Sequence, residues 1–213
     1  MKSIPFGPIS IFVRYLTLLL LISFGPANAE EQKNNEKQKK LYATINTSLG
    51  AIQLELYKNR APKTVENFIN YASTHFYDNT LFHRVIPGFM VQGGGFDVSF
   101  AKKPTLAPVK NEANAFIPNI RGTISMARTS DPHSATSQFF INVVDNASLN
   151  KNARSDGYAV FGKVVNGMHL ADKISKVKTT SQNYMQNVPA TPVIIESVVI
   201  SGALSNAQVK ASK

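Results

Sequence analysis

The stretch Phe82-His83-Arg84-Val85-Ile86-Pro87-Gly88-Phe89-Met90-Val91-Gln92-Gly93-Gly94 is the most informative part of this chain. Its Pro-Gly pair predicts a tight turn between two adjacent extended segments. These segments bring one arginine, bulky apolar side chains and one glutamine together, with no evident covalent nucleophile. The combination favours chemistry in which a lone cation acts beside an apolar pocket.

Periodic patterns on both sides of this stretch predict a mostly β domain. Apolar residues alternate with other residues over 41–45 and again over 52–56, which predicts a hairpin. Pro62 can begin a helix, and the residues after it are apolar at helical spacing. Strands outnumber helices without regular alternation, so an antiparallel barrel or sandwich with two packed helices is favoured over a parallel α/β sheet. The other predicted elements are strands at Leu81–Ile86, Phe89–Gly93, Gly122–Met126, Gln138–Val143, Ala159–Val165 and Val193–Ile200, and a short helix at Met168–Ile174.

The N-terminal segment has the features of a secretory signal peptide. Lys2 supplies a positive start, an apolar run covers 16–22, and Ala27-Asn28-Ala29 fits a cleavage site after Ala29. An uncleaved membrane anchor is the alternative, but the apolar run is short for a span. The chain has no cysteine, which excludes disulfides and suits an oxidising compartment. The predicted organisation is a signal peptide at 1–29, a flexible polar linker at 30–40, one folded domain at 41–202 and a disordered tail at 203–213.

The chain is basic, with 23 Lys and Arg against 13 Asp and Glu, a formal net charge of +10. Apart from a lysine-rich run at 33–40, these charges are scattered along the sequence. A nucleic-acid-binding protein would gather them with aromatic residues on one face, so we expect a solvated basic surface and no nucleic-acid partner. Weak attraction to anionic membranes or acidic clients stays open.

Motifs for other kinds of chemistry are absent from the sequence. Gly93-Gly94-Gly95 lacks phosphate-loop spacing and instead predicts a tight bend that ends a strand. No histidine pair has H-x-x-x-H spacing, and no G-x-S-x-G motif occurs, so neither a metal site nor a hydrolase triad is expected. Phe139 and Phe140 should point to opposite faces of a strand, one into the core and one to the outer surface.

Taken together, these segments resemble the cyclophilin-type peptidyl-prolyl cis-trans isomerases, over essentially all of 41–200. The detailed match looks closest to the periplasmic cyclophilins of Gram-negative bacteria. The motifs that carry the resemblance are the opening stretch, Gly122-Thr123-Ile124-Ser125-Met126-Ala127, Ala135-Thr136-Ser137-Gln138-Phe139-Phe140-Ile141-Asn142-Val143 and Gly157-Tyr158-Ala159-Val160-Phe161-Gly162-Lys163-Val164.

The resemblance implies a closed eight-stranded antiparallel β-barrel capped by two α-helices, with a substrate groove on the outside. It implies that Arg84 is the catalytic cation, and that no covalent intermediate, metal or other cofactor takes part. It also implies that Gln92 and Gln138 position Arg84 or the substrate backbone. The other implied substrate-binding residues are the walls of the proline pocket, Phe89, Met90, Phe140 and Leu149, together with Ala127 and the backbone of Arg128, the groove-lining His83, and Tyr158.

Two positions depart from the pattern of the family. Ser148 stands where a Trp or Phe usually precedes the pocket leucine, and Tyr158 stands where many members have His. Loss of the aromatic residue should open one side of the pocket, so we expect weak binding of cyclosporin-like macrocycles with isomerase activity retained.

The resemblance and the signal peptide together imply a role in the periplasm. The expected partners are proline-containing polypeptides of exported proteins, whose folding the enzyme would assist, with no stable membrane association after cleavage. A chaperone that holds such segments without catalysing rotation is the main alternative. The expected oligomeric state is a monomer.

Overall fold

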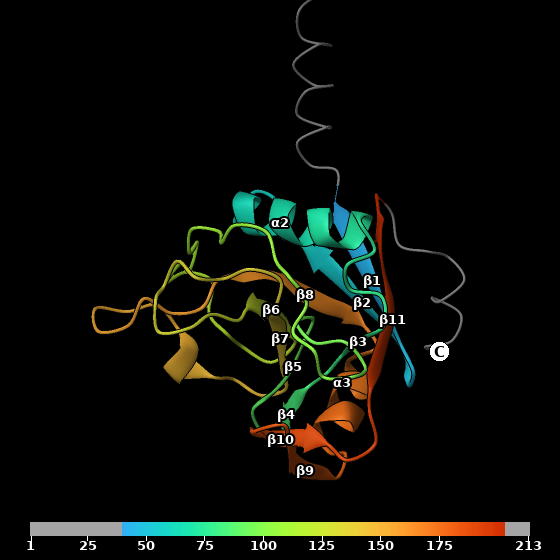
Figure 1. Ribbon diagram of the computed structural model, residues 1–213. Coiled ribbons are helices and arrows are strands. Elements are labelled where there is room, and N and C mark those ends of the chain that lie inside the picture. Colours follow the sequence, from blue (N-terminus) through green and yellow to red (C-terminus); the bar gives the residue numbers. More distant parts are fainter. Residues whose placement is uncertain (1–39, 203–213) are drawn as a thin grey trace, which may run out of the picture. The chain divides into compact units, whose positions relative to one another are not determined.

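The computed structural model describes residues 40–202, and one antiparallel sheet dominates this range (Figure 1). Its nine strands lie in the order β3, β11, β1, β2, β8, β6, β7, β5, β4. The predicted signal peptide, nearly all of the linker and the tail lie outside the described residues. The strands are β1 (Leu41–Thr47), β2 (Gly50–Leu56), β3 (Thr80–Leu81), β4 (Arg84–Ile86), β5 (Met90–Gly93), β6 (Thr123–Met126), β7 (Phe139–Asn142), β8 (Val160–Asn166) and β11 (Ile194–Ser201).

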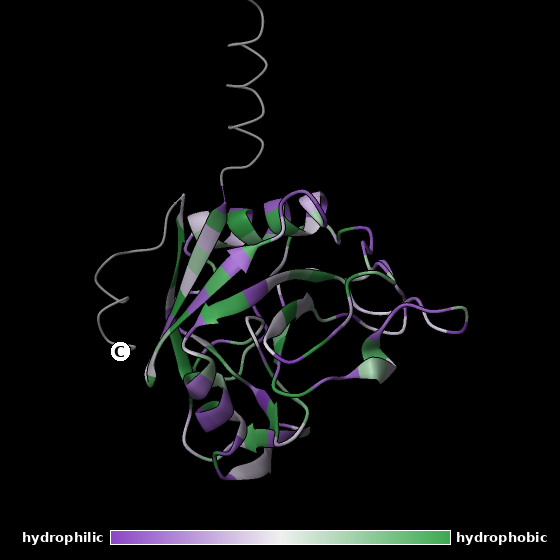
Figure 2. Cartoon of the chain, turned by 180° about the vertical axis from the view of Figure 1, so that it is seen from behind, coloured by the Kyte–Doolittle hydropathy of each residue, from purple (hydrophilic) through white to green (hydrophobic). Residues whose placement is uncertain are grey.

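The hairpin predicted from alternating apolar residues is confirmed as β1 and β2. Ala43 pairs with Leu54 and Ile45 with Ile52, and all four side chains are buried in the core. β11 pairs with the other edge of β1, so the hairpin lies inside the sheet and not at its margin. Figure 2 shows the hydrophobic residues concentrated in the strands, while many outer loop residues are hydrophilic.

The sheet is strongly curled, but the closed eight-stranded barrel that the resemblance implied is not what the structure shows. The segment 81–86, predicted as one strand, is divided between β3 and β4. β3 pairs with β11 whereas β4 pairs with β5, and Phe82 and His83 lie between them. Apolar alternation predicts an extended segment, but it does not predict that the segment changes its strand partner midway. The sheet therefore has nine strands instead of eight. It is open, because its two end strands, β3 and β4, do not pair with each other.

Both predicted helices are present and lie toward opposite ends of the curled sheet (Figure 1). They are α2 (Pro62–Ser73) and α3 (Met168–Ser175). α2 buries Val65 and Phe68 in the core, as their spacing predicts. Its first turn is capped from a distance, because the Glu112 carboxylate accepts hydrogen bonds from the backbone N–H groups of Lys63 and Thr64 at 3.2 and 2.8 Å.

One hairpin was not predicted from the sequence. It consists of β9 (Thr179–Gln182) and β10 (Met185–Pro189) and forms its own two-stranded sheet near β4. Asn183 and Tyr184 both have positive φ, 49° and 62°, which is the geometry of a tight hairpin turn. Between residues 40 and 202, no helix has the length and hydropathy needed to span a membrane.

Candidate active site

Strand register places Arg84 and Gln92 of the opening stretch on one face of the sheet together with Phe140. Arg84 pairs with Gln92, Gln92 with Phe140, and Phe140 with Ser125 across four neighbouring strands. Directly paired residues of antiparallel strands share a face, and Met90 shares it too because it stands two positions from Gln92. The alternate row, which includes Val85, Val91, Ile141 and Ile124, is fully buried in the core.

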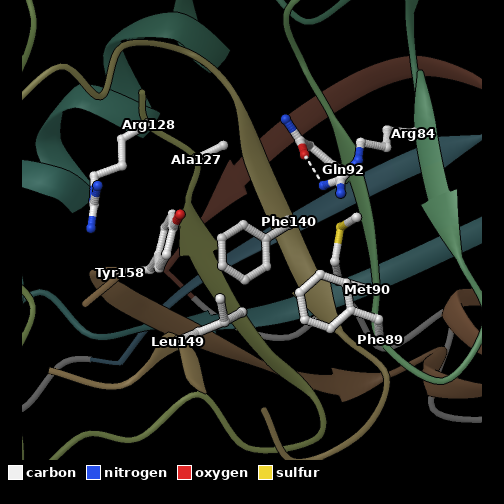
Figure 3. A pocket seen from close by; sticks show the side chains of 9 residues that line it. All are labelled: Arg84, Phe89, Met90, Gln92, Ala127, Arg128, Phe140, Leu149 and Tyr158. Atoms are coloured by element: carbon white, nitrogen blue, oxygen red, sulfur yellow. Dashed lines mark hydrogen bonds between the residues drawn. The ribbon is translucent and has the colours of Figure 1, made fainter. Parts of the chain in front are cut away.

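The face that carries Arg84 is hollowed into a cavity of about 220 Å³, which we call the groove (Figure 3). This volume suits a single small side chain better than a large ligand. Phe139 is fully buried in the core and Phe140 lines the groove, so the predicted division of the two rings is confirmed. The lining residues are Arg84, Phe89, Met90, Gln92, Ala127, Arg128, Phe140, Leu149 and Tyr158.

Two glutamines hold Arg84 at one end of the groove. Arg84 Nη1 donates to Gln92 Oε1 at 3.3 Å, and Gln92 Nε2 donates to Gln138 Oε1 at 2.9 Å. Gln138 is not part of the groove wall and acts from behind Gln92. Because Gln138 accepts from the amide nitrogen of Gln92, the amide oxygen of Gln92 is the atom left to face Arg84.

The other end of the groove carries Arg128 and Tyr158. The Arg128 guanidinium carbon lies 4.4 Å from the centroid of the Tyr158 ring, a cation–π contact. The Tyr158 ring meets Phe140 edge-on, with centroids 5.6 Å apart. Figure 3 shows Phe140 in the middle of the groove, with Arg84 toward one end and Arg128 toward the other.

His83 was expected to line the groove, but the structure places it behind the wall. The residue is only 4% exposed and its ring packs on Phe96, with centroids 4.7 Å apart. Burial, helped by the nearby Arg84 charge, lowers the pKa of His83 from 6.5 to about 4, although the Leu81 backbone and the Gln138 side chain oppose this shift. His83 is therefore neutral at physiological pH and supplies no charge to the groove.

A buried asparagine network, which the sequence did not predict, supports the walls of the groove. Asn119 Nδ2 donates to the backbone carbonyls of Leu149 and Tyr158 at 3.0 and 3.3 Å. Asn146 Nδ2 donates to the Phe89 carbonyl at 2.9 Å and to Asn142 Oδ1 at 2.7 Å. Asparagines in loops usually read as turn residues, so no sequence pattern marked them as supports.

The cavity is lined by two arginines, one glutamine, one tyrosine and apolar side chains. Nowhere in the described range 40–202 do three or more His, Cys, Asp or Glu side chains gather in a way that could hold a metal ion. The aromatic walls are suited to contacting a small apolar ring, and Arg84 is suited to donating a hydrogen bond to a polar group attached to that ring.

Comparisons with known proteins identify the family of this chain. A family model described as cyclophilin type peptidyl-prolyl cis-trans isomerase/CLD matches residues 42–200. Peptidyl-prolyl cis-trans isomerase A of Dickeya dadantii is 52% identical over 190 residues, which cover 89% of this chain and 96% of that protein. Peptidyl-prolyl cis-trans isomerase B of Escherichia coli is 52% identical over 161 residues, covering 74% of this chain and 98% of that one.

Solved structures show the same fold. A cyclophilin-type peptidyl-prolyl cis-trans isomerase from Cryptosporidium parvum superposes with a TM-score of 0.64 at 26% identity, covering 76% of this chain and 98% of that one. The same protein in the presence of the dipeptide Ala-Pro gives a TM-score of 0.63 at 27% identity, covering 75% and 98%. With the family model matched along nearly the whole described domain, the chain belongs to the cyclophilin-type peptidyl-prolyl cis-trans isomerases and is an enzyme of that type.

Proposed function

We propose that the groove holds a client proline and that Arg84 is the catalytic residue for rotation about the preceding peptide bond. The observation that carries this proposal is the position of Arg84 at one end of a cavity whose middle is lined by apolar side chains. Among residues 40–202, no carboxylate forms a salt bridge with Arg84, and its hydrogen bond to Gln92 uses only one of five N–H donors. Its charge and its remaining donors are therefore available to a client.

The reaction needs a group that recognises a twisted amide. Rotation about an X–Pro bond destroys amide resonance and meets a barrier of about 20 kcal/mol. In the twisted state the prolyl nitrogen regains a lone pair and can accept a hydrogen bond, which the planar amide nitrogen does poorly. A guanidinium directed at that nitrogen stabilises the transition state more than the ground state, and this difference is what accelerates a reaction.

The apolar walls supply the remaining part of the mechanism. Phe89, Met90, Phe140 and Leu149 would grip the proline ring while the preceding carbonyl swings. A thousandfold acceleration requires about 4 kcal/mol of selective stabilisation. One charge-assisted hydrogen bond contributes roughly 1.5–3 kcal/mol, and anchoring of the ring supplies the rest. Rotation by this route breaks no bond, so it requires no covalent intermediate and no cofactor.

Replacement of Arg84 tests the assignment. Loss of one charge-assisted hydrogen bond predicts that Arg84→Ala lowers kcat/KM for a prolyl tetrapeptide by about 10- to 150-fold. Circular dichroism and thermal unfolding should stay close to wild type, because Arg84 is partly exposed. Arg154→Ala is the matched control, since it removes an exposed cation outside the groove. Unchanged turnover in folded Arg84→Ala would reject the role of Arg84.

We further propose that the enzyme is exported, is cleaved after Ala29 and assists the folding of periplasmic proteins as a monomer. Support comes from the sequence at Lys2, from the apolar run at 16–22 and from the small residues Ala27 and Ala29. A separate chaperone activity would rely on the apolar walls alone. Arg84→Ala would then lose isomerase activity and still suppress client aggregation.

A further inference from the structure

The end of the groove opposite Arg84 carries a cation that the proposed rotation mechanism does not use. Arg128 follows β6 and lines the same cavity. In Figure 3 its side chain lies beyond Tyr158, with Phe140 and Leu149 between it and the Arg84 end. The groove therefore has one guanidinium toward each end and apolar side chains between them.

The Arg128 side chain is held in place before any client binds. Its Nε donates to the Gly157 carbonyl at 3.1 Å, and its Nη1 donates to the Thr129 carbonyl at 2.9 Å. The guanidinium carbon lies over the Tyr158 ring, 4.4 Å from its centroid, and this contact further restrains the side chain. A fixed side chain loses little conformational entropy on binding, which favours its use as a recognition group.

The charge of Arg128 has no carboxylate partner in the part of the chain that the structure describes. By contrast, Arg121 forms a two-pronged pair with Asp172, with both N–O distances at 2.7 Å. The two carbonyls that Arg128 contacts use two of its five N–H donors and leave its full charge in place. The side chain is thus able to receive a carboxylate from a ligand.

We propose that Arg128 is a specificity residue that favours clients with an acidic side chain at one of the two positions preceding the proline. The inference rests on the proposed function, in which the proline ring is gripped near Phe140 and its nitrogen faces Arg84. We further place the residues before the proline along Ala127 and Arg128, at the far end of the groove, as the resemblance to the family implies for this segment. Arg128 is partly exposed, so the expected preference is about two- to fivefold, the size of an exposed ion pair.

The test compares glutamate with its neutral isostere glutamine in acetyl-capped peptide amides. The pairs are Ala-Glu-Pro-Phe with Ala-Gln-Pro-Phe, and Glu-Ala-Pro-Phe with Gln-Ala-Pro-Phe, measured at low salt by exchange NMR without a coupling protease. In wild type we expect the kcat/KM ratio of Glu to Gln to be about two to five for at least one pair. Arg128→Gln should bring that ratio to about one, and salt should lower it in wild type.

Two controls separate a local contact from general electrostatics. Arg154→Gln removes the same charge from a nearby loop outside the groove and should keep the wild-type ratio. A peptide with glutamate after the proline should show no preference. A wild-type ratio near one for both pairs, an unchanged ratio in Arg128→Gln or an equal loss in Arg154→Gln would overturn the proposal. Failure to isomerise Ala-Ala-Pro-Phe would instead reject the proposed function.

Discussion

Arg84 and His83 are consecutive residues whose side chains meet opposite environments. Successive side chains of an extended segment point to opposite faces, so Arg84 reaches the groove while His83 enters the interior beside Phe96. The buried Nδ1 atom of His83 has no hydrogen-bond partner. A neutral histidine thus lies directly behind Arg84, the proposed catalytic residue, and its protonation should be costly.

The low pKa of His83 predicts acid sensitivity of the fold. The folded protein protonates His83 near pH 4 and the unfolded chain near pH 6.5, so the unfolded state binds more protons between these values. Stability should therefore fall as the pH drops from 6.5 to 4, by about 3 kcal/mol for this group. Urea unfolding across this range measures the effect.

His83→Gln is the control for that titration. The variant keeps the carboxylates and loses only the titrating ring, so the difference in stability between the two proteins isolates His83. The variant should show a flatter pH dependence between 6.5 and 4. Parallel curves for wild type and variant would contradict the burial of a neutral His83.

At the scale of elements, the glycine bend after β5 determines where Gln138 can lie. β5 ends at Gly93, and Gly94 has a φ of +81°, so the predicted bend is confirmed. The next glycine, Gly95, packs against Gln138, and a Cβ there would lie only 2.6 Å from Gln138 Nε2. The bend therefore leaves room for the amide that orients Gln92.

Gly95→Ala should weaken catalysis without touching the groove. The added methyl must displace Gln138, and Gln92 then loses its partner and holds Arg84 less firmly. Loss of one such hydrogen bond predicts a decrease in kcat of about fivefold. In a Gln138→Ala background the same change should have no further effect, because the displaced side chain is already gone. Additive losses in the double variant would show that Gly95 acts by another route.

The sequence was sufficient for those elements whose apolar residues repeat at a regular spacing. The β1–β2 hairpin and both helices were predicted because their buried residues recur at strand or helix spacing, and the strands that carry Arg84, Gln92 and Phe140 were predicted from short apolar runs. β9 was missed because Thr179–Gln182 is largely exposed and contains no apolar alternation. The break between β3 and β4 was missed because it depends on a change of strand partner, which is a tertiary property.

The parts of the candidate site that could be predicted are those in which both contacting residues belong to the same sequence motif. Arg84 and Gln92 stand in one motif and pair across a single turn. Asn119 contacts Leu149 and Tyr158 from a distant loop, and nothing in its own neighbourhood indicates those partners. The burial of His83 likewise depends on Phe96, which lies beyond the motif.

At the scale of the whole molecule, the proposed export predicts a chain shortened at its N-terminus. Intact-mass measurement of the protein from a periplasmic fraction should give a chain that begins at Glu30. Replacing Ala29 by a bulky residue such as Leu should leave the segment 1–29 attached, because the cleavage site requires small side chains. A cytoplasmic protein that retains Met1 would contradict the proposed location.

The position of β11 in the sheet determines when the enzyme can complete its fold. β11 is the last strand of the domain in sequence, yet it lies between β1 and β3 and so joins the first hairpin to the segment that leads to Arg84. Until this strand arrives, β1 and β3 have no partner on that side, and long-range pairing of this kind forms slowly. A chain that crosses a narrow pore from its N-terminus would therefore stay unfolded during passage. It would complete its sheet only after the final strand had emerged.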